Sequence, residues 1–513
     1  MRLRSPSKAR AIIDNVNSPK FEPTLQMLFN SLKYALFLPI VFALFWATPQ
    51  KYRVWILLVA SYVFYMTWRP GFILLIIGLT LANYYIGFAI HKAKEVKGKK
   101  AWLTLSVILN LATLAFFKYA YFFNDCVTAF IKPLGLPATH LPFDIILPLG
   151  ISFFVFEFIH YTTDVYRGSE PIKSLPAFAL FASFFPTQIA GPIKRFQDFI
   201  PQFLAESKLT VATFDSAVSL ILLGLFKKVL IADNLSFFVQ GGFGNAGLFS
   251  GTDLWIFTYA FAFQIYFDFS GYTDIARGSA MLFGYKVPIN FNLPYLARNI
   301  AEFWHRWHIS LSTWLRDYLF IPLGGSRVGR WKVHRNLLIT MTLGGLWHGA
   351  AVHYLLWGVF HGALLVVHRE FQALQKLPSF AWLKNAVASR PGTILSGLLT
   401  FHAVCIGWVF FRAETNAVAF QMIRKMFTFA PVFCESKMVS AVLPTINYPL
   451  IYPSIFLLLP ILAVAHLIMG WLNTTTYVSR TPKIAKAVWC CTMIFLVMVF
   501  SPDKSPRFIY FQF

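Results

Sequence analysis

The sequence predicts an all-α, polytopic integral membrane protein with about 11 transmembrane helices, plus re-entrant or interfacial helices. Hydrophobic residues make up 57% of the 513 positions and charged residues only 13%, whereas soluble domains carry roughly 25% charged residues. Many apolar runs approach the ~20 residues that a helix needs to cross a bilayer, and no alternating pattern indicates a β-barrel. Because lipid satisfies no backbone polar group, these runs are expected to be helices.

Apolar runs define the expected helices and the domain boundaries. Residues 1–26 are expected to be a polar N-terminal extension, since they lack the apolar core of a signal peptide, and Met27 is an alternative start. Residues 27–501 are expected to form one membrane-embedded domain, and residues 502–513 a C-terminal tail. Mixed charges and aromatic residues over 412–447 predict surface helices rather than a soluble domain. Several spans are short, which predicts re-entrant helices; the spans lie near 32–47, 54–68, 71–90, 101–123, 143–163, 174–190, 212–232, 253–268, 271–285, 336–350, 351–368, 393–411, 449–472 and 485–501.

Basic residues gather in short loops between the apolar runs. A net charge of +24 would suggest nucleic acid as a partner of a soluble protein, but here the positions follow the positive-inside pattern, which places both loops in the cytoplasm. Anionic headgroups are a sufficient partner for this charge. Membrane lipids are therefore expected as partners and nucleic acid is not. The loops contain Lys92, Lys94, Lys97, Lys99 and Lys100, and Arg327, Arg330, Lys332 and Arg335.

Residues 297–320 differ from the spans because their apolar side chains recur at i, i+3, i+4 and i+7, the period of a helix. Tryptophans beside charged residues suit a helix that lies at the membrane surface. We expect one interfacial amphipathic helix over this segment. Its apolar side carries Ile300, Phe303, Trp304, Trp307, Leu311, Trp314, Leu315 and Tyr318, and its polar side carries Glu302, His305, Arg306, Ser312, Arg316 and Asp317.

Ionisable residues inside spans are the strongest functional clues, because each costs roughly 2.5–3.5 kcal/mol at mid-helix. A first cluster places Glu157, His160 or Tyr161, Asp164 and Arg167 on one helical face. Internal ion pairing and a cavity wall are both compatible with this polar stripe.

A second cluster lies between residues 264 and 278. Asp274 and Arg277 are three residues apart and are expected to form a structural ion pair. Asp268 has no partner nearby in the sequence, so a functional role stays open for it. Gly271 is expected to mark a helix break.

The third cluster consists of two histidine motifs, His305-Arg306-Trp307-His308 and the run from 344 to 349 (GGLWHG). A lone histidine in a span is often a hydrogen-bonded core residue. His348 differs because flanking glycines allow backbone or substrate to approach closely. Histidine also suits proton transfer near neutral pH, so we expect a functional role for His348.

Metal and nucleophile chemistry are less well supported by these motifs. Glu302, His305 and His308 have spacings that resemble metal ligands, but a di-iron site would need further histidine-rich boxes. The five cysteines show no ligand spacing, so no metal is expected. The sequence has neither a Gly-x-Ser-x-Gly elbow nor a phosphate-binding glycine loop.

Six segments carry a resemblance to a known family. They are 303–312 (FWHRWHISLS), 314–318 (WLRDY), 321–327 (IPLGGSR), 346–349 (LWHG), 185–193 (FPTQIAGPI) and 410–413 (FFRA). Together they resemble the membrane-bound O-acyltransferase family, and within it the bacterial alginate O-acetylation branch. The resemblance runs from about residue 27 to residue 413.

The resemblance implies a site and a reaction. It places His348 as the catalytic histidine of a membrane-embedded tunnel and His308 as its upstream partner. It implies transfer of an acetyl group from a cytoplasmic thioester, expected to be acetyl-CoA, to hydroxyls of an extracytoplasmic polysaccharide such as alginate, with no bound cofactor. Secondary candidates in these motifs and clusters are His305, Asp268, Arg316, Asp317 and Trp347.

The resemblance also implies a location and a partner. Relatives of this kind lie in the bacterial inner (cytoplasmic) membrane as multi-pass proteins and pass the acyl group to an extracytoplasmic acyltransferase. Because no soluble domain is expected here, that partner is expected to be a separate protein. The alternatives are a lipid or teichoic-acid acyltransferase of the same family, and an ion or solute transporter whose pathway uses Glu157, Asp268, Asp274 and His348. Transporters usually show internal repeats, and none is visible.

Overall fold

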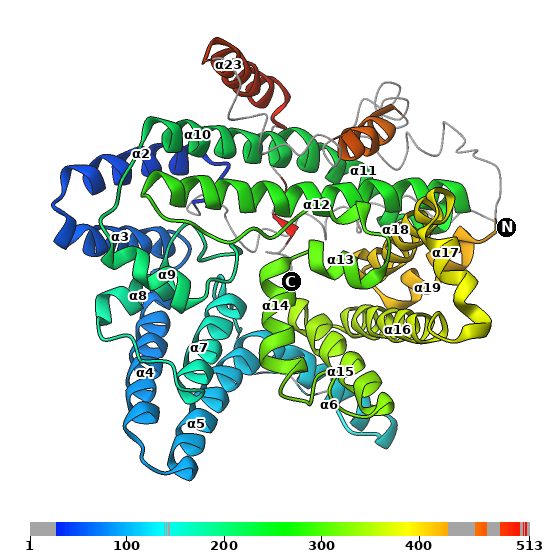
Figure 1. Cartoon of the computed structure of the whole chain (residues 1–513), viewed down its shortest axis with the longest axis horizontal. Coiled ribbons are helices and arrows are strands. Elements are labelled where there is room, and N and C mark those ends of the chain that lie inside the picture. Colours follow the sequence, from blue (N-terminus) through cyan, green and yellow to red (C-terminus); the bar gives the residue numbers. More distant parts are fainter. Residues whose placement is uncertain are drawn as a thin grey trace.

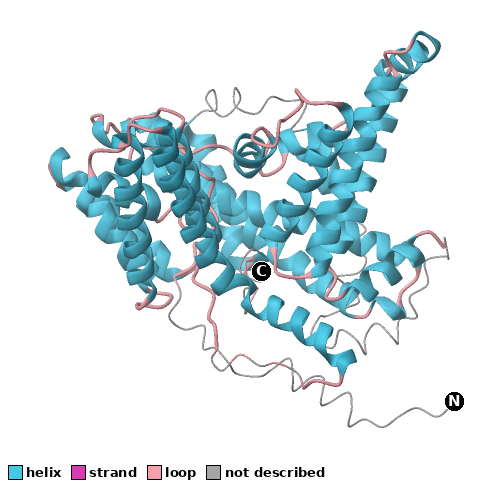
Figure 2. Ribbon diagram, turned by 90° about the horizontal axis from the view of Figure 1, so that it is seen from below, coloured by secondary structure: helices cyan, strands magenta, loops and turns pink. Residues whose placement is uncertain are grey.

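The computed structural model describes residues 27–428 except 138, 140, 142 and 143, together with 457–468, 483–502, 506, 508 and 509. All regular elements within these ranges are helices (Figure 1 and Figure 2), which confirms the all-α fold class. The predicted extension 1–26 lies outside the described residues.

The first half of the chain forms a group of helices in which α4, α5 and α7 pack together (Figure 1). The elements are α2 (Leu32–Ala47), α3 (Gln50–Met66), α4 (Phe72–Lys92), α5 (Val96–Leu114), the π-helical turn η1 (Ala115–Tyr119), α6 (Ala120–Ile131), η2 (Lys132–Leu134), α7 (Ile151–Tyr166), α8 (Leu175–Ser183) and α9 (Phe196–Leu204).

The second half contains the long helix α12 and the hairpin of α15 and α16. In Figure 1, α10 and α12 lie side by side across the top of the view. The elements are α10 (Val211–Leu225), η3 (Phe226–Ala232), α11 (Asp233–Gly244), η4 (Ala246–Leu248), α12 (Gly251–Leu282), η5 (Pro294–Leu296), α13 (Ile300–Arg306), α14 (Ile309–Leu315), η6 (Arg316–Phe320), α15 (Arg330–His348), α16 (Val352–Leu374), η7 (Pro378–Phe380), α17 (Ala381–Ala388), α18 (Arg390–Arg412), α19 (Asn416–Met426) and α23 (Lys483–Phe500).

Three helices in the described part of the chain are long and apolar enough to cross a membrane by length and composition. They are Phe72–Lys92, Val96–Leu134 and Arg390–Arg412. Shorter apolar helices span Leu32–Ala47, Leu457–Ile468 and Ile484–Phe500. The prediction of about 11 crossings therefore stays a prediction.

Three local predictions were wrong. The spans 253–268 and 271–285 form one continuous 32-residue helix, α12. Gly271 does not break it. A Cβ there would lie 2.7 Å from the Gly224 carbonyl oxygen, so the glycine is needed for close packing of α10 against α12. The expected helix over 174–190 ends at Ser183, and the one over 143–163 begins at Ile151.

The predicted amphipathic helix over 297–320 is also interrupted. It forms α13 and α14, which are separated at Trp307 and His308, and then continues into η6. Periodicity predicts which side chains are apolar but cannot reveal such a break, because the side chains on either side keep nearly the same phase. Of the expected surface helices over 412–447, α19 is described and residues 429–447 lie outside the described part.

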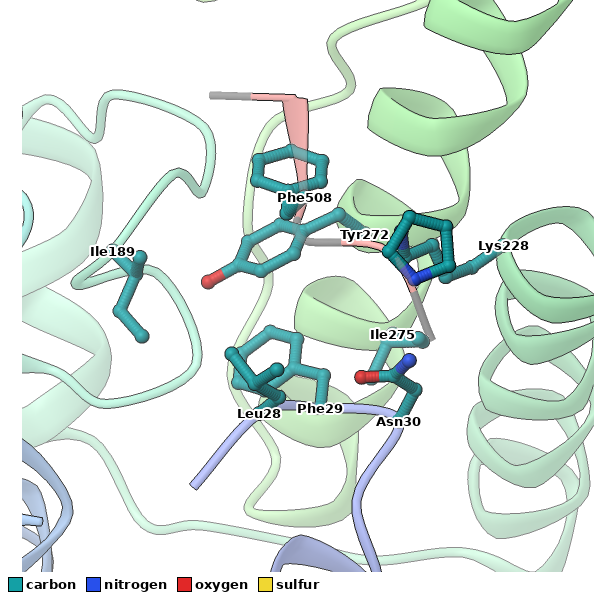
Figure 3. A pocket seen from close by; sticks show the side chains of 9 residues that line it. Leu28, Phe29, Asn30, Ile189, Lys228, Tyr272, Ile275 and Phe508 are labelled. Atoms are coloured by element: carbon teal, nitrogen blue, oxygen red, sulfur yellow. The ribbon is translucent and has the colours of Figure 1, made fainter. Parts of the chain in front are cut away.

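Residues from the two ends of the described chain meet on α12. Tyr272 is stacked between Phe29, whose ring centroid lies 4.5 Å away, and Phe508, at 4.8 Å (Figure 3). Phe508 and Ile509 are 3% and 5% exposed, and the Ile509 amide donates a hydrogen bond to Asp268 Oδ2 at 2.8 Å. Part of the predicted tail 502–513 is therefore packed in the protein interior.

Candidate functional site

His348 is the last residue of α15, at the turn into α16. The two helices approach closely at glycines, because a Cβ on Gly345 would lie 2.2 Å from the Tyr354 carbonyl oxygen, and one on Gly358 would lie 2.3 Å from that of Met341. Small residues allow such contact between helices in membranes. The prediction that glycines beside His348 serve close backbone approach is confirmed at Gly345.

The His348 side chain is 4% exposed and surrounded by aromatic rings. Its ring centroid lies 5.0 Å from that of Trp347, 5.1 Å from that of Trp357 and 5.2 Å from that of Phe411. The three rings come from α15, α16 and α18. An imidazole held this way has few rotamers available and is shielded from bulk water.

His308 lies at the break between α13 and α14. Its backbone is left-handed, with φ +42° and ψ +54°. That conformation costs a non-glycine residue about 1–3 kcal/mol and clusters at functional sites. The side chain is fully buried, with its ring centroid 4.7 Å from that of Phe269 on α12.

The segment before α13 holds this break in place. The Asn292 amide donates to the Arg306 carbonyl at 3.0 Å, and the Ile309 amide donates to the Asn290 carbonyl at 3.0 Å. Ser310 Oγ donates to Asn290 Oδ1 at 2.7 Å. Backbone groups that the interrupted helix would leave unsatisfied are thus paired, as burial requires.

Trp347 contacts both histidines. Its ring centroid lies 5.0 Å from that of His348 and 6.1 Å from that of His308. Phe156 stacks on Trp347 at 5.4 Å and on Trp314 at 3.7 Å. The secondary candidate Trp347 therefore joins the two principal candidates, which the sequence places 40 positions apart.

A cavity of about 350 Å³ lies beside this group on the α13–α14 side. Both His305 and Arg316, two of the secondary candidates, line it, and both are exposed. Trp304 lines it too, and its ring contacts Trp357 at 5.6 Å, which in turn contacts His348. The lining also includes Ser312, Thr313, Ser326, Thr340, Met341 and Arg369.

Asp317 lies in an ion-pair network rather than in this cavity. Its Oδ1 accepts from Arg316 Nε at 2.7 Å, and its Oδ2 accepts from Arg195. Partial burial acts to raise the pKa of Asp317, but hydrogen bonds from Arg316 and Arg195 outweigh it and hold that pKa below the usual carboxyl value. Asp317 thereby orients Arg316 at the edge of the cavity.

Asp268, which has no partner nearby in the sequence, gains a distant one in the fold. Lys228 on η3 places its Nζ 2.7 Å from Asp268 Oδ1 and 2.6 Å from Asp233 Oδ1, and all three side chains are at most 9% exposed. The partner is 40 positions earlier in the sequence, beyond the range of any local spacing rule. Asp268 thus belongs to a buried charge cluster on α12.

Other charged residues of the first two clusters also form ion pairs. Lys194 Nζ lies 2.7 Å from Glu157 Oε1, and Arg167 lies 3.4 Å from Asp164, which favours internal ion pairing over a cavity wall for that stripe. The expected pair of Asp274 and Arg277 is present at 3.7 Å. Asp274 has a closer partner in Lys227, at 2.6 Å.

The sequence analysis missed Lys118 and Tyr119 on η1. Lys118 Nζ donates to the carbonyls of Trp347 at 2.6 Å and His348 at 3.1 Å. The Tyr119 hydroxyl donates to the Leu346 carbonyl at 2.7 Å. A lone lysine inside the apolar run 101–123 was the available signal.

A second cavity, of about 290 Å³, lies near the turn between α15 and α16. Its lining includes Phe411, whose ring contacts His348, and Tyr354. The rest is mostly polar and comprises Ser236, Gln240, Gln264, His353, Arg412, Ala413, Glu414, Pro506 and Ile509. Aromatic rings separate His348 from both cavities: Trp357 and Trp304 lie toward the first, and Phe411 lies toward the second.

Within the described ranges, no group of three or more histidine, cysteine or carboxylate side chains could hold a metal ion. Glu302, whose spacing from His305 resembles that of metal ligands, instead forms an ion pair with Arg306 at 2.8 Å.

Comparison with known protein families places this site in a larger group of proteins. The model of the membrane-bound O-acyltransferase family matches residues 57–409, more than half of the chain and a range that includes both His308 and His348. The chain belongs to the membrane-bound O-acyltransferase family. It is thus a membrane protein of an acyltransferase family, as the resemblance implies.

Several known proteins are similar to the chain over more than half of its length. "Probable alginate O-acetylase AlgI" of Pseudomonas aeruginosa is 43% identical over 79% of this chain and 75% of the relative. "Peptidoglycan O-acetyltransferase" of Helicobacter pylori is 35% identical over 95% of this chain and 98% of the relative. "Teichoic acid D-alanyltransferase" of Bacillus subtilis is 32% identical over 54% of this chain and 71% of the relative.

Proposed function

We propose that this chain is a multi-pass O-acetyltransferase of the bacterial inner membrane that takes an acetyl group from acetyl-CoA on the cytoplasmic side and delivers it toward hydroxyls of an extracytoplasmic polysaccharide. The observation that carries the proposal is the meeting of His308 and His348 on Trp347, with two cavities linked to His348 through aromatic rings. Names of the relatives support acetyl or acyl transfer to an envelope polymer.

The cavity of 350 Å³ is the proposed donor site. It opens beside α15, whose first turn belongs to the basic loop expected in the cytoplasm. Arg316 and Arg369 in its lining suit the phosphates of acetyl-CoA, because guanidinium groups bind phosphate oxygens through charge-assisted hydrogen bonds. Coenzyme A itself is too polar to enter lipid, so only its acetyl end approaches Trp304 and the histidines.

In the proposed acetyl transfer, the two imidazoles have different roles. His348 accepts the proton of the acceptor hydroxyl as its oxygen attacks the thioester carbonyl carbon. The carbon–sulfur bond breaks, and the coenzyme A thiolate takes that proton from His348, which leaves an ester and a free thiol. His308 stabilises the oxyanion that develops on the carbonyl oxygen. General base catalysis of this kind is worth about 10²–10⁴-fold in rate.

The cavity of 290 Å³ is the proposed acceptor side, since it is mostly polar and adjoins His348 through Phe411. A hydroxyl-bearing group matches its glutamine, serine and charged lining. We further propose that a separate extracytoplasmic acyltransferase receives the acetyl group there. Because of its 43% identity with alginate O-acetylases, alginate is the first polymer to test; peptidoglycan and teichoic acid are the alternatives named by other relatives.

A single substitution tests the catalytic role. In inverted membrane vesicles from cells that make the polymer, labelled acetyl-CoA is supplied to the cytoplasmic face and ester-linked label on the polymer is measured. His348→Ala is expected to reduce incorporation at least 100-fold. The control is His91→Ala, an exposed histidine at the end of α4, which is expected to keep full activity. Full incorporation by a folded His348→Ala protein contradicts the proposal and favours transport.

A second substitution tests the donor site. Arg316→Ala is expected to raise the KM for acetyl-CoA about tenfold, because one charge-assisted contact to phosphate is worth about 1.5–3 kcal/mol. Its kcat is expected to stay within about twofold, since Arg316 is more than one helical turn from His308 along the chain. An unchanged KM would place the donor elsewhere.

A further inference from the structure

Lys118 is an ionisable residue in a span that the proposed reaction does not use. It lies on η1, inside the continuous apolar stretch Val96–Leu134. Among the residues that the structure describes, no carboxylate forms an ion pair with it. An ionisable residue inside a membrane span costs free energy, and such residues usually mark a functional site.

The hydrogen bonds of the Lys118 ammonium go to the C-terminal turn of α15 and to Ser152 on α7. Nζ reaches the carbonyls of Trp347 at 2.6 Å and His348 at 3.1 Å, and lies 3.5 Å from Ser152 Oγ on α7. These are the last carbonyls of α15, which have no partner within their own helix. A cation there also complements the negative end of the helix dipole, typically by 0.3–2 kcal/mol.

The π-helical geometry of η1 explains how a lysine reaches this turn. π-Helical turns within α-helices are rare and occur frequently at functional sites. Here Ala115–Tyr119 brings two consecutive donors onto consecutive carbonyls, since Tyr119 hydroxyl donates to Leu346 at 2.7 Å while Lys118 serves Trp347 and His348. The backbone of the turn that carries the imidazole is therefore fixed from outside its own helix.

We propose that Lys118 is a positioning residue that holds the C-terminal turn of α15 and so places the His348 imidazole and Trp347 for acetyl transfer. This inference rests on the proposed function of His348. Lys118 does not line the proposed donor cavity, so it acts on the rate of the chemical step and not on donor binding. The Lys118 charge lies 5.8 Å from the centroid of the Trp347 ring, which holds that ring as well.

The test separates positioning from folding. Lys118→Met keeps the length and apolar stem of the side chain but removes the hydrogen-bond donors. We expect about a 100-fold lower kcat in the vesicle assay, as for a ~1 Å misplacement of the His348 imidazole. The KM for acetyl-CoA is expected to stay within about twofold of the wild-type value. Lys118→Arg keeps a cation and donors and is expected to recover at least tenfold over Lys118→Met. Lys132→Met, which removes an exposed lysine after α6, is the matched control and is expected to be neutral.

Each result either supports or overturns the positioning role of Lys118. A folded Lys118→Met protein with normal kcat overturns the inference, and so does an equal loss with Lys118→Arg. If Lys118→Met does not fold, Lys118→Gln keeps a hydrogen-bonding group on a shorter side chain without the charge, and a normal kcat for that variant also overturns the inference. Activity in His348→Ala would refute the proposed function itself, so the two failures are distinguishable.

Discussion

Gly345 gives a quantitative prediction about the placement of His348. An added Cβ would lie 2.2 Å from the Tyr354 carbonyl oxygen, whereas ordinary contact begins at 3.4 Å. Gly345→Ala therefore requires α15 and α16 to separate by about 1.2 Å at this point. His348 follows three residues later on the same helix, and a misplacement of ~1 Å costs about 100-fold in rate.

The assay is labelled acetate incorporation in inverted vesicles, normalised to the amount of folded protein. The matched control is Gly78→Ala on α4, where an added Cβ has no neighbour within 4 Å. Glycine to alanine within a helix is otherwise favourable by about 1 kcal/mol, so the control is expected to be fully active. A folded Gly345→Ala protein with more than a third of the wild-type rate would refute the reasoning.

Two further predictions concern charges outside the reacting group. Lys228→Met is expected to lower the free energy of unfolding by about 3–5 kcal/mol, because Asp233 and Asp268 then lose their shared buried cation. Thermal unfolding in detergent measures this loss. The control is Lys208→Met, which removes the cation of an exposed ion pair. Asp317→Asn is expected to destabilise the protein at pH 7. The destabilisation is expected to shrink as pH falls below the unfolded pKa near 3.9 and to disappear below the depressed pKa of Asp317 in the folded protein, where the carboxyl is protonated in both states. An equal loss of stability at pH 7 and below the folded-state pKa would contradict the second prediction.

The helical class and much of the placement of helices could be predicted because both depend on local patterns. Apolar runs of helix length are visible in any window, and α2 matches its expected range of 32–47. Gly271 shows the limit of such rules. A glycine in a sequence is compatible with a break or with close packing, and only the neighbouring helix, through Gly224, decides between them.

The candidate histidines could be singled out from flanking glycines and family-like motifs, but their surroundings could not. The meeting of His308 and His348 on Trp347 depends on a left-handed residue that interrupts α13–α14. Contacts such as Lys118 with Trp347 join residues 229 positions apart. No spacing rule reaches that far, so the partner of a charge inside a span must come from the fold.

The helix α15 carries Arg330 at its first residue and the candidate catalytic His348 at its last. It begins at Arg330, which pairs with Glu370 on α16, and it ends 18 residues later at His348. At 1.5 Å per residue, these ends are about 27 Å apart along the axis, close to the ~30 Å thickness of the hydrocarbon core. The length of the helix therefore sets the distance between the Arg330–Glu370 ion pair and the imidazole of His348.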